Sequence, residues 1–302
     1  MGRLRSSVVN EWITPAPPID LAARFPELAP YARTTTRLHP RRGEPGVRDS
    51  SLGGPLLWPA DEPWPIQPGS FFGPFEDTPV PAVPLFQLYR RDVAQLPFPE
   101  GTDLLQLLWY PIEHAATDSG HPEIIMVWRD STGVTDVLTD VPRDDSGYPY
   151  VPVPCVLHPE PGVLEYPSRS GDQPEGWDWS RLEEFEEATG WDAFCTLFVA
   201  SGAKVGGWPH FCQGATWQKC PNCSRRMELL LTLDVGEWDG EGWKRWIPQA
   251  EERLRTDRLT GRSLDQQSIA QSPSEIDLGG GCINLYYCPI CPGMPHAQWY
   301  DR

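Results

Sequence analysis

The chain of 302 residues carries 42 acidic and 25 basic side chains, a net charge of −17, with 14 tryptophans and 35 prolines. Disordered chains avoid large aromatic rings, so this composition indicates a folded, turn-rich protein. The strongly acidic balance argues against a broad basic face for nucleic acid. There is neither an apolar run of bilayer length nor the apolar segment of a signal peptide, so we expect no membrane partner, a cytoplasmic location and reduced thiols.

Residues 1–50 are predicted to form a lead-in rich in proline and arginine. Asp20 is a suitable N-cap for one short helix, which Pro26 would interrupt. The arginines of this segment are interpreted as a solvated loop: Arg33, Arg37, Arg41, Arg42 and Arg48.

A first β unit is predicted over residues 51–175. It opens with a double-glycine turn, Gly53-Gly54-Pro55, followed by Trp58-Pro59. Short apolar runs separated by turn residues then have the length of strands, at 85–89, 104–110, 124–128 and 151–157.

A second β unit, 176–302, is predicted to pack with the first as one globular body. It begins with a helix over 179–199, capped by Asp178 or Ser180, because apolar residues recur there at helical spacing. Strands are expected at 227–233 and 283–287. The acidic residues that follow the first of these strands miss the calcium-loop spacing, so they are interpreted as a solvated turn: Asp234, Glu237, Asp239 and Glu241.

The order of features in the two units indicates an internal duplication. Each unit has a double-glycine turn with proline, an apolar strand, a spacer and a strand rich in aromatic or large apolar residues. Glycine pairs permit positive φ, and the following proline fixes the direction of the exit. We therefore predict a mostly β fold with minor α content, built from duplicated β units.

Two matching Cys-Pro-x-Cys pairs are the strongest chemical signal in the sequence: Cys220, Cys223, Cys288 and Cys291. Zinc prefers four tetrahedral ligands, and each pair supplies two thiolates. The first pair precedes one predicted strand and the second follows another, so antiparallel pairing would bring all four together, with 235–281 as an insertion at the far end. This arrangement predicts a zinc-ribbon-like site with one structural Zn²⁺ per chain.

Several alternatives remain open for these and other reactive side chains. The two pairs could form redox dithiols, although no βαβ context supports that. Cys212, Cys282, His210 or His296 could replace a ligand. Cys155 with His158 could form a nucleophile and base, yet nothing supplies a third group. We identify no catalytic residue and expect no enzyme.

Tryptophans in turn- or loop-like sequence either pack proline-rich segments onto the core or form a binding groove. The groove would consist of residues beside the glycine pairs and in the insertion: Trp58, Trp64, Trp208, Trp217, Trp238 and Trp243.

At its glycine turns and strands the chain resembles the YwqG-like family. Residues 53–59 and 85–88 are similar to that family's first half, and 206–213 with 230–234 to its second. The resemblance implies a duplicated, mostly β fold without an established activity. The cysteine pairs depart from the simpler pattern and resemble programmed cell death protein 2 and its relatives, which act as chaperones for a basic ribosomal protein. Thr232 replaces the family's usual glutamine, which puts any role of that glutamine in doubt.

These observations favour a cytosolic, zinc-stabilised protein that binds a protein or peptide, for which the acidic surface suggests a basic partner. A toxin-neutralising or other conflict-system partner is the first alternative, and an enzyme of unassigned class is the second. The sequence indicates no particular oligomeric state.

Overall fold

The computed structural model describes residues 11–67, 79–112, 121–142, 149–169, 171–211, 214–238 and 240–301. In these ranges the chain is mostly β, as predicted, with two six-stranded sheets and a two-stranded ribbon, all antiparallel. The first sheet has the order β2 (Arg41–Arg42), β9 (Cys155–Val156), β3 (Ser51–Leu52), β6 (Val83–Tyr89), β7 (Leu104–Trp109), β8 (Ile124–Arg129). The second has the order β10 (Glu160–Glu165), β1 (Arg33–Arg37), β11 (Lys204–Gly206), β12 (Glu228–Asp234), β13 (Cys282–Tyr287), β14 (His296–Asp301). The ribbon pairs β4 (Ile66–Gln67) with β5 (Val80–Pro81).

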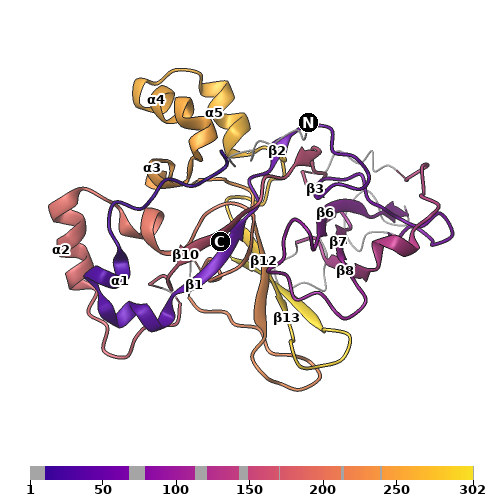
Figure 1. The fold of residues 1–302 in the computed structure, drawn as a ribbon, viewed down its shortest axis with the longest axis horizontal. Coiled ribbons are helices and arrows are strands. Elements are labelled where there is room, and N and C mark those ends of the chain that lie inside the picture. Colours follow the sequence, from indigo (N-terminus) through magenta and orange to yellow (C-terminus); the bar gives the residue numbers. More distant parts are fainter. Residues whose placement is uncertain are drawn as a thin grey trace, which may run out of the picture.

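One hydrophobic core joins the two sheets. Alternate side chains of β7, such as Leu105 and Leu107, enter the same buried cluster as Ile283 and Leu285 of β13. Side chains alternate across a strand, so the remaining residues of these strands occupy the outer faces. In Figure 1, β6, β7 and β8 lie at one end of the molecule, α1 and α2 at the other, and β12 and β13 between them.

Two segments of the chain pass through both sheets. Residues 33–42 supply β1 to the second sheet and β2 to the first, while 155–165 supply β9 to the first and β10 to the second. The predicted lead-in therefore needs correction, because β1 lies within the second sheet, paired with β10 and β11. The predicted unit boundaries at 50 and 175 do not coincide with the division between the sheets.

The helices agree with the sequence at their starts better than at their ends. Asp20 caps α1 (Leu21–Arg24), since the Ala23 N–H donates to its carboxylate at 3.0 Å, and α1 ends before Pro26 as expected. The long helix predicted over 179–199 is wrong in its second half. Helix α2 (Ser180–Thr189) stops at Gly190, which adopts φ +70°, and a separate π-helical turn follows at Phe194–Phe198.

The 235–281 insertion contains three helices that the sequence analysis did not predict: α3 (Trp243–Trp246), α4 (Glu252–Thr260) and α5 (Leu264–Gln271). Short 3₁₀ turns complete the helical segments, at Pro26–Tyr31, Ser131–Gly133, Gly240–Gly242 and Gln249–Glu251. Throughout the described ranges, no helix has the length and apolar character needed to cross a membrane.

Four consecutive strands follow the same order and register in both sheets. The series β3-β6-β7-β8 corresponds to β11-β12-β13-β14. Leu52 lies opposite Phe86 in the first sheet, and Val205 opposite Leu231 in the second. The second strand of each series also has a register irregularity at its third residue, between Pro84 and Phe86 in one and between Leu229 and Leu231 in the other.

A buried side-chain amide recurs at the same place in both series. Gln106 of β7 donates to the Leu57 carbonyl at 3.0 Å, and Asn284 of β13 donates to the His210 carbonyl at 2.9 Å. Each carbonyl lies four residues after the first glycine of its turn. We call these two contacts the amide clamps. Each clamp residue also bonds to the residue opposite it, as Asn284 does to the hydroxyl of Thr232 at 2.8 Å.

A buried ionic network connects the two sheets, and it corrects two sequence predictions. Arg37, expected in a solvated loop, is 1% exposed, and Glu237, expected in a solvated acidic turn, is 2% exposed. Arg41 pairs with Glu237 at 3.1 Å and with Glu251 at 2.6 Å. Burial alone would raise the pKa of Glu237, but the hydrogen bond from His39 and the charges of Arg41 and Arg37 outweigh it and lower that pKa to about 2.

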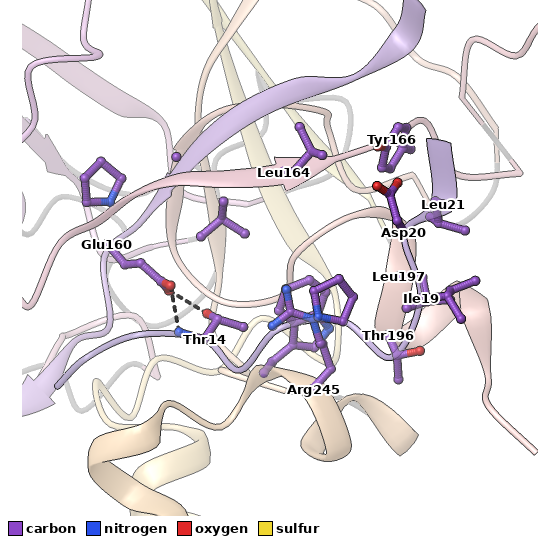
Figure 2. A pocket seen from close by; sticks show the side chains of 15 residues that line it. Thr14, Ile19, Asp20, Leu21, Glu160, Leu164, Tyr166, Thr196, Leu197 and Arg245 are labelled. Carbon is purple, nitrogen blue, oxygen red and sulfur yellow. Dashed lines mark hydrogen bonds between the residues drawn. The ribbon is translucent and has the colours of Figure 1, made fainter. Parts of the chain in front are cut away.

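The same network holds the N-terminal segment against β10. The Thr14 N–H and hydroxyl both donate to the carboxylate of Glu160, the former at 2.6 Å (Figure 2). The other partner of that carboxylate is His39, whose Nε2 lies 2.9 Å from it. Glu160 is therefore fully committed to partners within the chain.

A second buried ion pair fixes the glycine turn of the second sheet. Lys204 and Glu165 are both fully buried, with Nζ and Oε1 2.6 Å apart. Glu165 also accepts from the Trp208 N–H at 2.7 Å. A Cβ on Gly207 would lie 2.1 Å from this carboxylate, and Gly207 has φ +75°, so both space and backbone require glycine there.

Candidate metal centre

The β12–β13 hairpin brings the two cysteine pairs together, as the sequence predicts. Glu228 at the start of β12 lies opposite Tyr287 at the end of β13. Cys220 and Cys223 immediately precede that end of the hairpin, and Cys288 and Cys291 follow it. The 235–281 insertion leaves from the opposite end, where Asp234 faces Cys282.

Backbone hydrogen bonds shape each cysteine pair into a tight turn. In the first, the Ser224 N–H donates to the Cys220 carbonyl at 2.8 Å. In the second, the Cys288 N–H donates to the Pro295 carbonyl at 2.8 Å, and the Met294 N–H to the Cys291 carbonyl at 3.1 Å. These bonds close the turns before any ligand is considered.

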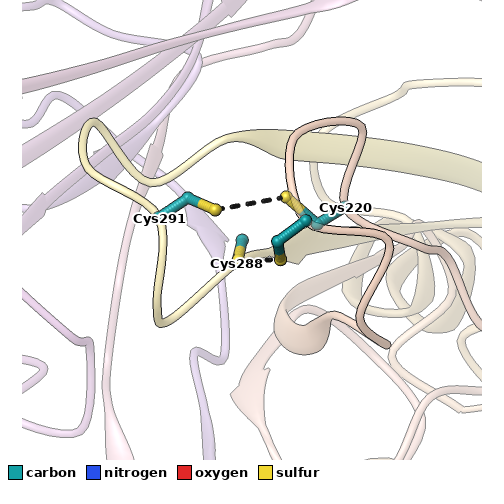
Figure 3. Close-up of side chains that lie close together, drawn as sticks. Cys220, Cys288 and Cys291 are labelled. Carbon is teal, nitrogen blue, oxygen red and sulfur yellow. Dashed lines mark hydrogen bonds between the residues drawn. The ribbon is translucent and has the colours of Figure 1, made fainter.

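The four sulfur atoms have the spacing of a tetrahedral metal shell. All four Sγ atoms lie within 4.8 Å of one another. Cys220 and Cys291 are 3.8 Å apart, and Cys223 and Cys288 are 3.7 Å apart. A tetrahedron with metal–sulfur bonds of about 2.3 Å has edges of about 3.8 Å. Figure 3 shows the labelled sulfurs of Cys220, Cys288 and Cys291 facing a common centre, so the cluster could hold a metal ion.

The electrostatics of the cluster suit a cation. Backbone N–H groups of Ile290 and Cys291 bond to the Cys288 sulfur and lower its pKa to about 6. Hydrogen bonding to Cys223, together with burial, raises the pKa of Cys291 to about 12. Four thiolates this close repel one another, and a bound cation would remove that obstacle to deprotonating all four.

The cluster sits on a small apolar patch of the outer face of the second sheet. Met227, Leu229 and Tyr286 are buried beneath it, and Trp217 packs at its edge. Arg226 lies over the Trp217 ring at 3.4 Å. The four cysteines and these apolar side chains therefore lie at the same end of the β12–β13 hairpin.

The possible substitute ligands lie elsewhere. Cys282 is at the opposite end of β13 from Cys288, and its Sγ is 3.8 Å from the His210 carbonyl. The His296 Nε2 lies 3.4 Å from the Ile124 carbonyl. None of these three residues is in the four-cysteine cluster, and Cys212 falls outside the described residues.

Cys282 and His210 instead line a separate pocket of about 840 Å³, together with Asp234. The His210 Nδ1 is 3.8 Å from the Asp234 carboxylate. Burial raises the pKa of Asp234 above its ordinary range, while the charge of His210 opposes that effect. Cys282 and His210 are predicted as possible substitute zinc ligands and Asp234 as part of a solvated turn, but no pattern in the sequence indicates that the three share a pocket.

Cys155 does not have the environment of a nucleophile. Burial raises the pKa of its thiol to about 12, and Sγ donates to the Val153 carbonyl at 3.3 Å. His158 stacks on Trp12 with ring centroids 4.1 Å apart. The sequence indicates no third group for this pair, and the high pKa of the Cys155 thiol is a further reason against a nucleophile there.

The predicted tryptophan surface needs correction. Five of its six members are buried, with exposed fractions of 9% or less: Trp58, Trp64, Trp208, Trp238 and Trp243. Only Trp217 is half-buried. Four of these indoles lie outside helices and strands and Trp243 begins α3, yet all five pack inward, because burying a large apolar ring is strongly favourable.

The sequence matches no protein-family model and no curated protein. The resemblance to the YwqG-like family and to programmed cell death protein 2 therefore stays a prediction.

Proposed function

We propose that the four cysteines hold one structural Zn²⁺ per chain. The observation that carries this proposal is the sulfur spacing, which matches the edges of a tetrahedral thiolate shell. Four protein ligands leave no position for water or substrate, so the metal would stabilise the fold without taking part in catalysis.

Metal analysis of the purified chain tests this assignment. We expect close to one zinc per chain, retained in a Cys155→Ser variant and lost in a Cys220→Ser/Cys288→Ser variant. A folded wild-type protein without metal would contradict the proposal.

We infer that the two sheets are copies of one duplicated β unit. The shared strand order, the shared register and the two amide clamps support this inference. Thr232 stands where the first sheet has Gln87, and each bonds to its clamp residue. The departure from the usual glutamine thus keeps that contact.

We further propose that the protein binds a protein or peptide segment by strand addition, without enzymatic activity. The terminal strand β10 supports this, because no other described strand pairs with its outer side and Leu164 is 48% exposed on it. By contrast, Gln298 of the other terminal strand, β14, contacts the Ile124 N–H of β8 at 2.8 Å. The net charge of −17 favours a basic partner.

Capture from a host lysate tests the binding function with two matched variants. Leu164→Lys places a charge on the β10 edge, and Leu259→Lys places the same charge on α4, where the leucine is 71% exposed. We expect partners to be retained by the wild type and Leu259→Lys and lost by Leu164→Lys. Equal capture by both variants would exclude β10 as the contact. A single folded partner held equally by both variants would favour the conflict-system alternative.

One observation favours a second candidate, catalysis of an unassigned class. Asp234 and His210 form a pair beside Cys282 in a pocket of about 840 Å³. Alkylation at neutral pH, followed by mass spectrometry, tests it. If the pocket activates the Cys282 thiol, Cys282 is alkylated faster than Cys155, and a His210→Ala variant slows the alkylation of Cys282. Equal inertness of both cysteines would remove this candidate.

A further inference from the structure

A pocket of about 430 Å³ lies along the outer side of β10. The first wall is β10 itself, from Glu160 to Leu164. The second is the N-terminal segment, from Thr14 to Leu21, and the remaining lining includes Thr196 and Arg245. Figure 2 shows Arg245 between the Thr14–Glu160 hydrogen bonds on one side and Thr196 on the other. A pocket of this size can take a small molecule or a few residues of a peptide.

Among the described residues, Arg245 is a buried cation without an anionic partner. It is 7% exposed, and no described group forms a hydrogen bond with its Nε. Its guanidinium donates to the Pro15 carbonyl, and among the described residues no carboxylate lies within ion-pair distance of it. Burial, followed by the nearby charge of Arg37, lowers its pKa to about 10, so it stays protonated at neutral pH.

The other charged groups of the pocket already have partners. Glu160 accepts from Thr14 and His39. Asp20 accepts from the Ala23 N–H at the start of α1. Arg37, beside the pocket, donates to the Thr14 hydroxyl and to the Trp246 carbonyl, each at 2.9 Å. Arg245 is therefore the one lining cation with an unused donor in the described part of the chain.

A buried charge is costly unless an opposite charge and hydrogen bonds compensate it. Guanidinium groups bind carboxylates and phosphates through paired N–H donors. Here two carboxylates, Glu160 and Asp20, also line the pocket, which disfavours a dianionic phosphate. A single negative charge would balance the single unpaired cation.

We propose that this pocket binds a carboxylate group, with Arg245 as the residue that recognises it. Two sources fit: a small monocarboxylic acid, and the C-terminal carboxylate of a peptide laid along β10. The second source deepens the proposed function and rests on it, whereas the first does not. The apolar residues that also line the pocket, Ile19, Leu21 and Leu197, suit a ligand with an aliphatic group attached to its carboxylate.

Calorimetry with matched probes on the full, metal-loaded chain tests the proposal. The small pair is 4-methylpentanoate and 4-methylpentanamide, and the peptide pair is acetyl-Ala-Val-Ala-Leu with a free or an amidated C-terminus. We expect at least one free carboxylate to bind at least tenfold more tightly than its amide. We expect Arg245→Gln to remove that preference, and Arg91→Gln, at an exposed arginine, to leave it unchanged.

Leu164→Trp keeps the proposal falsifiable where Arg245→Gln fails to fold. Leu164 is 48% exposed, so a larger ring there narrows the pocket without entering the core. We expect Leu164→Trp to lower the affinity for the carboxylate probe at least tenfold.

The outcomes separate the two proposals. If only the small acid binds, the result supports a carboxylate-binding pocket and counts against addition of a peptide strand at β10. Peptide binding that is indifferent to amidation and to Arg245→Gln would overturn the pocket and leave strand addition standing. Absence of any carboxylate preference up to millimolar probe would also overturn it.

Discussion

The outer faces of the two sheets are covered differently at corresponding positions. On the β6–β7 hairpin, Ala82 and Leu108 lie beneath the Trp58 and Trp64 indoles, whose centroids are 5.2 Å apart. On the β12–β13 hairpin, Met227 and Tyr286 lie beneath the four cysteines. A similar backbone is thus covered by aromatic side chains in one sheet and by a cluster of four cysteines in the other.

The opposite ends of the same hairpins also differ. In the first sheet Leu57, Tyr89 and Leu104 form a buried apolar cluster. In the second sheet the corresponding residues are His210, Asp234 and Cys282, which line a pocket. The first sheet is therefore closed by packing at both ends, whereas the second carries polar chemistry at both. We therefore expect the first sheet to contribute mainly packing, and the proposed sites to lie in the second.

The largest expected effect follows from removing the proposed zinc. Structural zinc contributes about 10–16 kcal/mol of binding free energy in small zinc domains, and part of that stabilises the fold. Chelation, or Cys220→Ser with Cys288→Ser, should abolish protection of β12 to β14 in hydrogen exchange while β6 and β7 stay protected. Cys155→Ser serves as the control. Equal loss of protection in both sheets would mean that they do not differ in their dependence on metal.

The next largest effect on the free energy of unfolding is expected in β11, which is compared with the corresponding strand β3. Lys204 of β11 corresponds in register to Ser51 of β3. Lys204→Ala leaves the Glu165 carboxylate buried and unpaired, which should cost about 3–5 kcal/mol in urea unfolding. Ser51→Ala should cost under about 1 kcal/mol, because no group in the described part of the chain forms a hydrogen bond with the Ser51 hydroxyl. Similar costs at both positions would contradict the description of Lys204 as an ion-paired residue.

An acid-sensitive contribution to stability is expected from Glu237, which follows β12. The pKa of Glu237 falls from 4.5 to about 2 on folding, so its stabilisation is complete above pH 4.5 and is lost as the pH falls toward 2. This amounts to about 3 kcal/mol. Glu237→Gln should flatten the fall in the free energy of unfolding over that range. A fall as steep in Glu237→Gln as in the wild type would contradict a contribution from this carboxylate.

The smallest expected effect distinguishes the two amide clamps. Asn284→Leu leaves the His210 carbonyl without its side-chain donor and should cost about 1–3 kcal/mol. Gln106→Leu should cost more, because Gln106 also accepts from the Arg129 Nε at 2.7 Å. Chemical denaturation of both variants measures the difference. If Asn284→Leu left the free energy of unfolding unchanged, the amide clamp would no longer support duplication.

The cysteine cluster could be predicted because its geometry is local. Each Cys-Pro-x-Cys pair adjoins a strand, and a single antiparallel pairing brings all four sulfurs together. The short helix capped by Asp20 and the mostly β fold class could also be predicted, since both depend on near neighbours in sequence.

The buried charges could not be predicted in this way. Thr14 and Glu160 are 146 residues apart, and Arg37 and Glu237 are 200 apart. Their positions depend on two crossovers between the sheets that no local pattern indicates. Helix α4 was missed for another reason, because Leu254 is its one buried residue and gives no apolar period.

The crossing segments also bear on synthesis of the chain. Strand β1 is made early, but its neighbour β11 follows only at residue 204, and the hairpin of cysteines ends at 291. A nascent chain that has just passed residue 156 already holds every strand of the first sheet and only β1 of the second. Since chains fold from the N-terminus as they emerge, the first sheet can form before β1 has either of its partner strands, β10 and β11. Capture of a metal would then be among the last events, completing a sheet whose earliest strand was made about 250 residues before.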